Sequence, residues 1–140
     1  MKNKIIISVL AICLIPNFLF AKNQYFQEWK ALYENKKFKK AKFKFEQEIV
    51  INPKSERSYL YLSKIFKKLE KKALEEQNLN TVILLNPKNE EAIYNLAKLK
   101  LDSSDYKISE ELNDRLIALC KKYCDKSKKL KIEIENLSKK

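Results

Sequence analysis

Ile51-Asn52-Pro53-Lys54 recurs as Leu85-Asn86-Pro87-Lys88, shifted by 34 residues along the chain. The same shift aligns residues on both sides: Phe45 with Leu79, Ile49 with Ile83, Glu56 with Glu90, Tyr59 with Ile93, Leu62 with Leu96 and Lys64 with Lys98. A fixed period of this length is typical of proteins in which one supersecondary unit stacks on copies of itself.

Each Asn-Pro pair predicts the end of a helix, because proline lacks an N–H group and disfavours helical geometry in the residue before it. Ser55 and Asn89 are predicted N-caps of the helices that follow, and Glu56 and Glu90 place negative charge at the positive ends of those helices. Between the stops, the apolar residues recur at helical spacing. The sequence therefore predicts helices over residues 24–34, 38–50, 56–68, 72–84, 90–101, 106–120 and 122–138.

This pattern resembles the tetratricopeptide repeat (TPR) family over residues 22–120, in units 22–55, 56–89 and 90–120. The positions that carry the resemblance are Leu32, Phe38, Ala41, Phe45, Ile49, Pro53, Tyr59, Leu62, Ser63, Phe66, Leu79, Ile83, Pro87, Ile93, Leu96, Ala97 and Tyr106. The resemblance implies an all-α fold, a short α-solenoid of antiparallel helix pairs. We expect the lysine-rich segment 121–140 to cap its end with an apolar stripe.

Several positions depart from the family pattern. Lys36, Glu70 and Ser104 stand where the family has a turn glycine, and Glu75 and Ser109 replace a small alanine. The third unit also has no closing proline. We expect divergent repeats with helix packing that differs in detail from the family average.

The absence of two residue types excludes several classes of enzyme. The chain has no histidine, which removes Ser-His-Asp and Cys-His catalysis and histidine-containing metal sites. It has no glycine, which removes glycine-rich phosphate loops and the nucleophile elbow. Its carboxylates lie among lysines and fit solvated ion pairs. We therefore predict a protein that is not an enzyme, with no catalytic residues, no metal site and no cofactor.

Cys120 and Cys124 are four residues apart on what the pattern predicts to be helix. A disulfide between these positions would strain a regular helix. We expect both thiols to stay reduced and to fill the last helical interface, with an intermolecular disulfide as the alternative in an oxidising compartment.

Residues 1–21 have the pattern of a secretory signal peptide cleaved near Ala21, with a short basic start and an apolar run broken by Pro16. The prediction is a periplasmic or secreted protein of the cell envelope. An uncleaved membrane anchor is the main alternative, and a lipoprotein modified at Cys13 is less favoured because Ile12 is bulky.

The TPR resemblance implies that the first helix of each pair lines a concave face that binds a protein or peptide. The groove residues carried over are Phe26, Lys30, Tyr33, Tyr61, Lys64, Lys68, Tyr94, Asn95 and Lys98. The formal net charge of +12 and the lysines of this set favour an acidic partner. The alternative function is binding of anionic lipid or cell-wall polymer through the basic C-terminal helix. Nucleic acid is not expected, and the oligomeric state is left open.

Overall fold

The computed structural model describes residues 24–139, which form seven helices and no strand. The first helix covers residues 24–34. The others are α2 (Phe38–Ile51), α3 (Glu56–Lys68), α4 (Lys72–Leu85), α5 (Glu90–Leu101), α6 (Tyr106–Leu119) and α7 (Cys124–Ser138). The predicted helices are confirmed to within two residues at each end. The predicted signal peptide, residues 1–21, lies outside the described residues, and none of the helices described has the length and apolar character needed to cross a membrane.

The chain divides into two compact units, Met1–Lys44 and Phe45–Lys140. In the first unit, the helix over residues 24–34 is followed by the start of α2. The ring centroids of Tyr33 and Phe38 lie 5.7 Å apart across the turn between these helices, and Tyr25 stacks on Trp29 at 6.5 Å. Aromatic contacts thus hold both the turn and the first helix.

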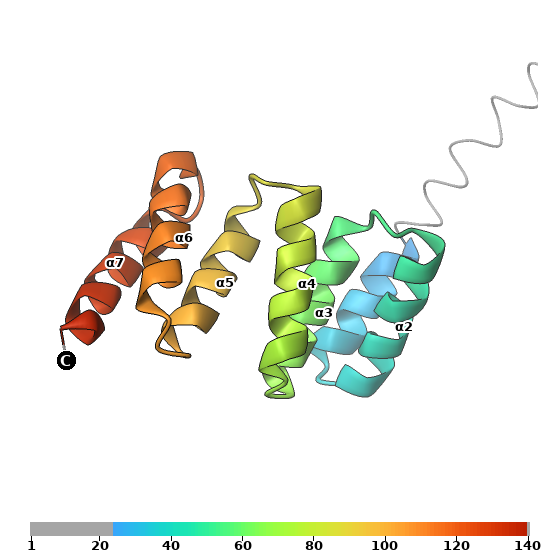
Figure 1. Ribbon diagram of the computed structural model, residues 1–140. Helices are drawn as coiled ribbons and strands as arrows, with labels where there is room; N and C mark the ends of the chain where they lie inside the picture. Colours follow the sequence, from blue (N-terminus) through green and yellow to red (C-terminus); the bar gives the residue numbers. More distant parts are fainter. Residues whose placement is uncertain (1–23, 140) are drawn as a thin grey trace, which may run out of the picture. The chain divides into compact units, whose positions relative to one another are not determined.

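In the second unit, α3 with α4 and α5 with α6 form antiparallel pairs, and α7 follows as a single helix (Figure 1). One core cluster joins the first pair to α5 and consists of Leu79, Val82, Ala92, Leu96 and Leu99. A second cluster joins α5 to α7 and consists of Ala97, Leu101, Leu130 and Ile134. The stacking buries one apolar face per helix, which is the all-α solenoid that the period predicts.

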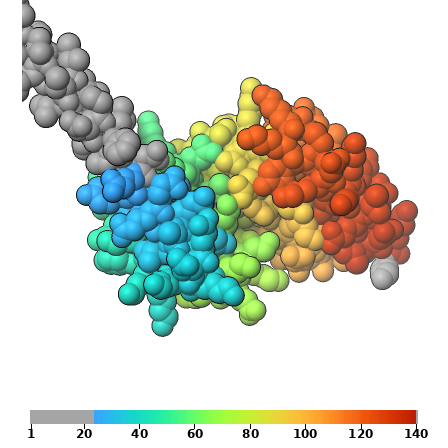
Figure 2. All heavy atoms as spheres, turned by 180° about the vertical axis from the view of Figure 1, so that it is seen from behind, coloured from blue at the N-terminus to red at the C-terminus, as the bar shows by residue number. Residues whose placement is uncertain are grey.

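Helix α7 caps the second unit. Its Leu130 is 1% exposed and its Ile134 is 4% exposed, while Ile132 between them is 59% exposed. One buried stripe and one solvent face are what a terminal helix needs to seal a stack. In the space-filling view, the yellow, orange and red atoms of α5, α6 and α7 pack as one continuous body (Figure 2).

The turn inside each predicted pair is closed without glycine. Lys36, Glu70 and Ser104 have φ angles of 58°, 56° and 60°, which is the left-handed region. After each of them, the next backbone N–H bonds at 2.9 Å to the carbonyl oxygen five residues earlier, as in the common glycine-closed helix end. These turns keep the backbone conformation that glycine gives in the family. A residue with a side chain pays a steric cost to adopt it.

The predicted helix caps are only half confirmed. Asn89 caps α5, because its side chain accepts a hydrogen bond from the N–H of Ala92 at 2.8 Å. Ser55 occupies the N-cap position of α3, as predicted, but its side chain makes no cap hydrogen bond. Its hydroxyl instead lies 2.8 Å from the hydroxyl of Ser58, where both residues are buried.

Candidate partner-binding face

Polar and aromatic side chains of α3, α5, α7 and the turn before α7 form a ladder of three separate groups of contacts in the second unit. We call it the first-helix face and define it by Tyr61, Lys64, Glu91, Tyr94, Lys98, Tyr123, Lys126 and Glu133. Four of these, Tyr61, Lys64, Tyr94 and Lys98, are residues predicted from the sequence. The others were not predicted.

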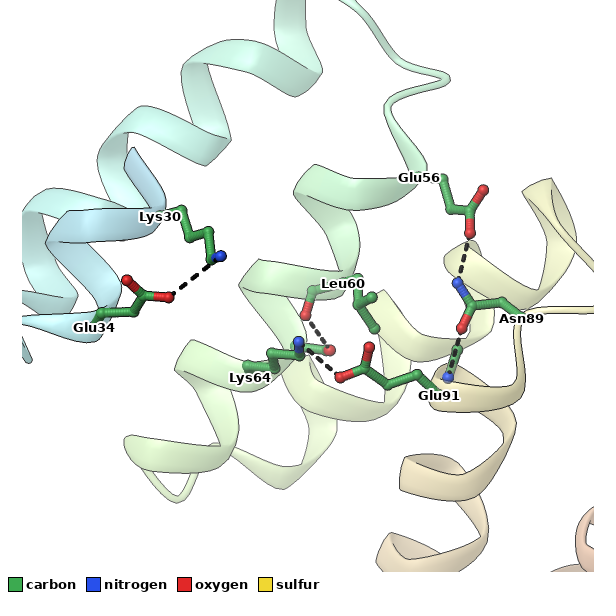
Figure 3. Close-up of polar contacts among 9 residues, drawn as sticks. Lys30, Glu34, Glu56, Leu60, Lys64, Asn89 and Glu91 are labelled. Atoms are coloured by element: carbon green, nitrogen blue, oxygen red, sulfur yellow. Dashed lines mark hydrogen bonds and ion pairs between the residues drawn. The ribbon is translucent and has the colours of Figure 1, made fainter. Parts of the chain in front are cut away.

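The α3 end of the ladder links an aromatic ring to an ion pair. Tyr61 stacks on Phe45 with ring centroids 5.0 Å apart, and the Lys64 ammonium lies 4.8 Å from the centre of the Tyr61 ring. The same ammonium lies 2.7 Å from a carboxylate oxygen of Glu91 on α5 (Figure 3). Lys64 therefore bridges two neighbouring first helices.

The α7 end of the ladder repeats this design. The Lys98 ammonium of α5 lies 2.7 Å from Glu133 of α7 and 3.9 Å from Asp102. Beside this pair, the rings of Tyr94 and Tyr123 lie 5.5 Å apart. The ladder thus crosses from α5 to α7 through both charge and ring contacts.

The Lys126 ammonium lies over both of these rings, 5.4 Å from the centre of Tyr94 and 4.3 Å from that of Tyr123. Burial raises the pKa of the Tyr123 phenol, and the neighbouring Glu91 carboxylate adds to that effect. The phenol therefore stays neutral and able to donate a hydrogen bond at any ordinary pH.

The other predicted groove residues are not part of the ladder. Lys68 is exposed near the end of α3, and Asn95 is half-buried in α5; no hydrogen bond or ion pair within the described chain joins either to it. In the first unit, Phe26 is only 8% exposed, which leaves little of its ring for a partner. Lys30 pairs with Glu34 at 3.4 Å, and Tyr33 packs near Phe38.

The charge of the ladder is more balanced than the sequence predicts. Lys64 and Lys98 are each paired with a carboxylate, so neither offers an unpaired cation to an acidic ligand. Ion pairs that are partly open to water typically contribute up to about 1 kcal/mol. Separating either pair therefore costs little.

The missed residues share one signal. A further shift of 34 residues places Glu90 on Cys124 and Leu96 on Leu130, so α7 matches the first helix of another unit. A first helix contributes side chains to the same face as α3 and α5. Assigning residues 121–140 to capping alone hides this contribution.

The cysteine prediction is wrong in this structure. Cys120 and Cys124 form a disulfide, with a Cα–Cα distance of 5.2 Å. The cysteine prediction placed both residues on one helix face, although the predicted helices already break at residue 121. In the structure, residues 120–123 form an irregular turn between α6 and α7. In that turn the two Cα atoms are at a normal disulfide separation. Both residues are half-buried and hold the turn rather than a core.

Away from the first-helix face, the groups of chemical interest are potential metal ligands and the buried carboxylate of Glu75. In the part of the chain that the structure describes, no group of three or more Cys, Asp or Glu residues could hold a metal ion. Glu75, in the position of a small residue, is 4% exposed, and burial raises its pKa while the nearby Lys67 ammonium opposes that shift.

Comparisons with known proteins agree on the fold. No family model matches the sequence, and no curated protein matches it. Among solved structures, the TPR2B domain of yeast Sti1 in its pHsp70 complex superposes with a TM-score of 0.75 at 15% identity, over 81% of this chain and 95% of that one.

Two further structures give the same result. The type III secretion chaperone SycD of Yersinia enterocolitica, in complex with a peptide of the translocator YopD, has a TM-score of 0.74 at 14% identity, over 83% and 91% of the two chains. The first TPR of Spaghetti (RPAP3), bound to the HSP90 peptide SRMEEVD, has a TM-score of 0.71 at 13% identity, over 80% and 89%. The chain therefore has a TPR-like fold.

Proposed function

We propose that the chain is a protein-interaction module whose first-helix face binds a segment of another protein. The observation that carries the proposal is the ladder itself, in which one ion pair joins α3 to α5, a second joins α5 to α7, and a ring pair joins α5 to the turn before α7. Tyrosine supplies rigid contact area at a low entropic cost, and lysine speeds the encounter with acidic groups. The three solved TPR domains named above were each determined with a peptide or a complex partner, which supports this role.

The ladder also favours a particular kind of ligand. Its rings are interleaved with both lysines and glutamates, so a matching segment carries apolar side chains together with charges of both signs. We expect acidic groups of the partner to meet Lys64 and Lys98, and a basic group to meet the carboxylates thereby released. Such an exchange keeps every charge paired.

The test is site-specific photo-cross-linking in the cells that make the full chain. A photoreactive residue replaces Asn95 on α5, beside the ladder, or Glu110 on α6, an exposed control on the second helix of the same pair. We expect a discrete adduct with one partner from position 95 and none from position 110. The Y61A/K64A/Y94A variant should lose that adduct. Equal adducts from both positions, or an adduct that survives the triple variant, would contradict the proposal.

We also propose that residues 1–21 direct export. The Cys120–Cys124 disulfide supports this, because such bonds persist in oxidising compartments. The test is the intact mass of the chain recovered from the cell envelope with thiols blocked at lysis. We expect removal of about 21 residues at the N-terminus and no blocked thiols at positions 120 and 124. A full-length chain with both thiols blocked would contradict export.

A further inference from the structure

The most exposed apolar side chains gather at the ends of two helices. Among the large apolar side chains that the structure describes as exposed, Ile51, Leu84 and Val50 are the most open, at 83%, 81% and 80%. The others are at most 59% exposed. All three residues lie in the last two positions of α2 or α4, just before an Asn-Pro turn. Exposure this high costs solvation free energy that a folded partner surface or a lipid phase would recover.

Exposed lysines recur beside these apolar residues at the period of the fold. Lys54, Lys88 and Lys122 are 34 residues apart, and each is exposed in the turn before α3, α5 or α7. No ion pair within residues 24–139 involves any of the three. Val50 and Leu84 are separated by the same 34 residues. The repeat therefore places an exposed apolar side chain and an unpaired lysine together at the first two turns, and a lysine alone at the third.

The three turns lie side by side on one edge of the second unit. Glu56 at the start of α3 accepts hydrogen bonds from the side chains of Asn86 and Asn89, which joins the first turn to the second. Glu90 at the start of α5 accepts hydrogen bonds from the backbone of the third turn. Figure 1 shows these turns along the same edge, and the yellow and orange turns stand together at the upper rim of Figure 2.

Glu56 and Glu90 add negative charge to this edge. Their carboxylates hydrogen-bond to neutral groups of the turns and form no ion pair with Lys54, Lys88 or Lys122 within residues 24–139. We call the set of Val50, Ile51, Lys54, Leu84, Lys88 and Lys122 the Asn-Pro edge.

We propose that the Asn-Pro edge binds the surface of an anionic lipid bilayer. Apolar side chains of this size enter the boundary between headgroups and acyl chains, while lysines beside them reach the phosphates. The exposed apolar residues project at two separate turns and do not form one flat patch. A lipid surface can adapt to each projection separately. The sign and the repetition of the charge fit anionic headgroups.

Helix α7 is a weaker candidate for the same ligand. Within Cys124–Ser138, four lysines are opposed by Asp125, Glu133 and Glu135, so the helix is close to neutral. Lys126 is also occupied by the rings of Tyr94 and Tyr123. Over the whole segment 121–140 the lysines outnumber the acidic residues by eight to three, because Lys121, Lys122, Lys139 and Lys140 flank the helix.

The experiment measures which residue meets the acyl chains in the full-length protein. Trp29 is the only tryptophan, so a W29F background allows a single new tryptophan to report its own surroundings. The L84W chain places it on the edge, and the I132W chain places it on the exposed face of α7. Vesicles contain lipids brominated in the acyl chains, with either phosphatidylglycerol and phosphatidylcholine or phosphatidylcholine alone.

We expect bromine to quench the L84W chain in the anionic vesicles, with little quenching of the I132W chain or with phosphatidylcholine alone. Neutralising the lysines in K54Q/K88Q/K122Q should weaken partitioning of the L84W chain on the order of 100-fold, about fivefold for each lysine. Added salt should weaken it as well.

Three outcomes would overturn the proposal. Equal quenching of L84W and I132W would show attachment by another part of the chain, and no quenching of either would show no contact with lipid. A blue shift of L84W that depends on protein concentration and needs no vesicles would show that a second copy covers the edge instead.

Discussion

Glu56 and Glu90 occupy the same position in consecutive units, yet they hold different groups in the next turn. Glu56 accepts hydrogen bonds from the side-chain amides of Asn86 and Asn89. Glu90 accepts hydrogen bonds from the backbone N–H groups of Lys121, Lys122 and Tyr123, at 3.1, 2.8 and 2.8 Å. The first junction contains an Asn-Pro stop, and the second does not.

The difference shows how a repeat can lose its stop signal and keep its shape. At the first junction, asparagine supplies both the helix cap and the partner of the glutamate. At the second junction, the glutamate itself satisfies N–H groups at the start of α7 that would otherwise lack partners. The Cys120–Cys124 disulfide spans this turn, whereas the turns after α2 and α4 each contain a proline. Covalent and ionic groups thus replace a local sequence signal.

The largest expected effect tests whether α7 is held by packing or by the turn. Leu130 is the counterpart of Leu96 and is 1% exposed, so L130A should lower the free energy of unfolding by about 3 kcal/mol. Chemical denaturation measures the loss, and hydrogen exchange over Cys124–Ser138 shows whether α7 opens alone. The control I132A changes an exposed residue of the same helix and should cost less than about 0.5 kcal/mol. Equal losses would mean that the apolar stripe does not hold α7.

The second effect isolates the covalent part of the junction. C120S/C124S removes a disulfide that closes a five-residue loop, and the loop-entropy estimate gives a loss of about 2 kcal/mol. Thermal unfolding with and without a reductant measures it: the reductant should destabilise the natural chain and leave the variant unchanged. A natural chain that ignores the reductant would show that Glu90 and packing suffice.

The third effect isolates the asparagine part of the other junction. N89A removes both the cap on the N–H of Ala92 and a partner of Glu56, and it should cost about 1–2 kcal/mol. N86A is the matched control, because it removes a partner of the same Glu56 but no cap of α5. Urea titrations should therefore rank N89A below N86A. The reverse order would assign the junction to the Glu56 contact rather than to the cap.

The smallest effect at neutral pH is expected for E90Q, and its signature is the pH dependence. Hydrogen bonds from the backbone of Lys122, Tyr123 and Lys121 hold the pKa of the Glu90 carboxyl below its ordinary 4.5. The stability that Glu90 contributes is therefore present above pH 4.5 and is lost as the pH falls through the lowered value. E90Q should flatten this acid limb when unfolding is followed from pH 7 to pH 3.

E75Q is a control that should change the pH dependence of stability in the opposite direction. Burial raises the pKa of Glu75, so its native form favours the proton and loses stability as the pH rises through the raised value. E75Q should gain stability at neutral pH relative to the natural chain. A Glu90 variant that behaves like E75Q would mean that its carboxylate is not held by the turn.

Most of the fold is written in local signals. The two Asn-Pro stops and the helical spacing between them predict helix ends to within two residues, because proline acts on its immediate neighbours. The break over residues 120–123 carries neither proline nor glycine, and its N–H groups are satisfied by Glu90, about thirty residues earlier. The helical spacing predicts a break at residue 121, but a local pattern cannot contain the Glu90 contact that shapes this turn, and so it does not predict the disulfide.

The candidate face divides in the same way. Tyr61, Lys64, Tyr94 and Lys98 follow from helix position alone. Their partners Glu91 and Glu133 depend on how helices far apart in the sequence stack, and so does the neutralisation of the lysines. Composition predicts the sign of the charge, whereas pairing decides how much of it a ligand meets.

The three left-handed residues have a practical consequence. Lys36, Glu70 and Ser104 adopt a backbone conformation that glycine favours, so substitution at these positions can raise the stability of the protein. Replacing each by glycine removes a steric clash between the Cβ atom and the backbone that costs about 1–2 kcal/mol. Part of this gain is offset, because glycine gives the unfolded chain more conformational freedom. All three side chains are exposed, and none belongs to the first-helix face or the Asn-Pro edge. A more stable variant of the protein can thus be made for binding studies without altering the first-helix face or the Asn-Pro edge.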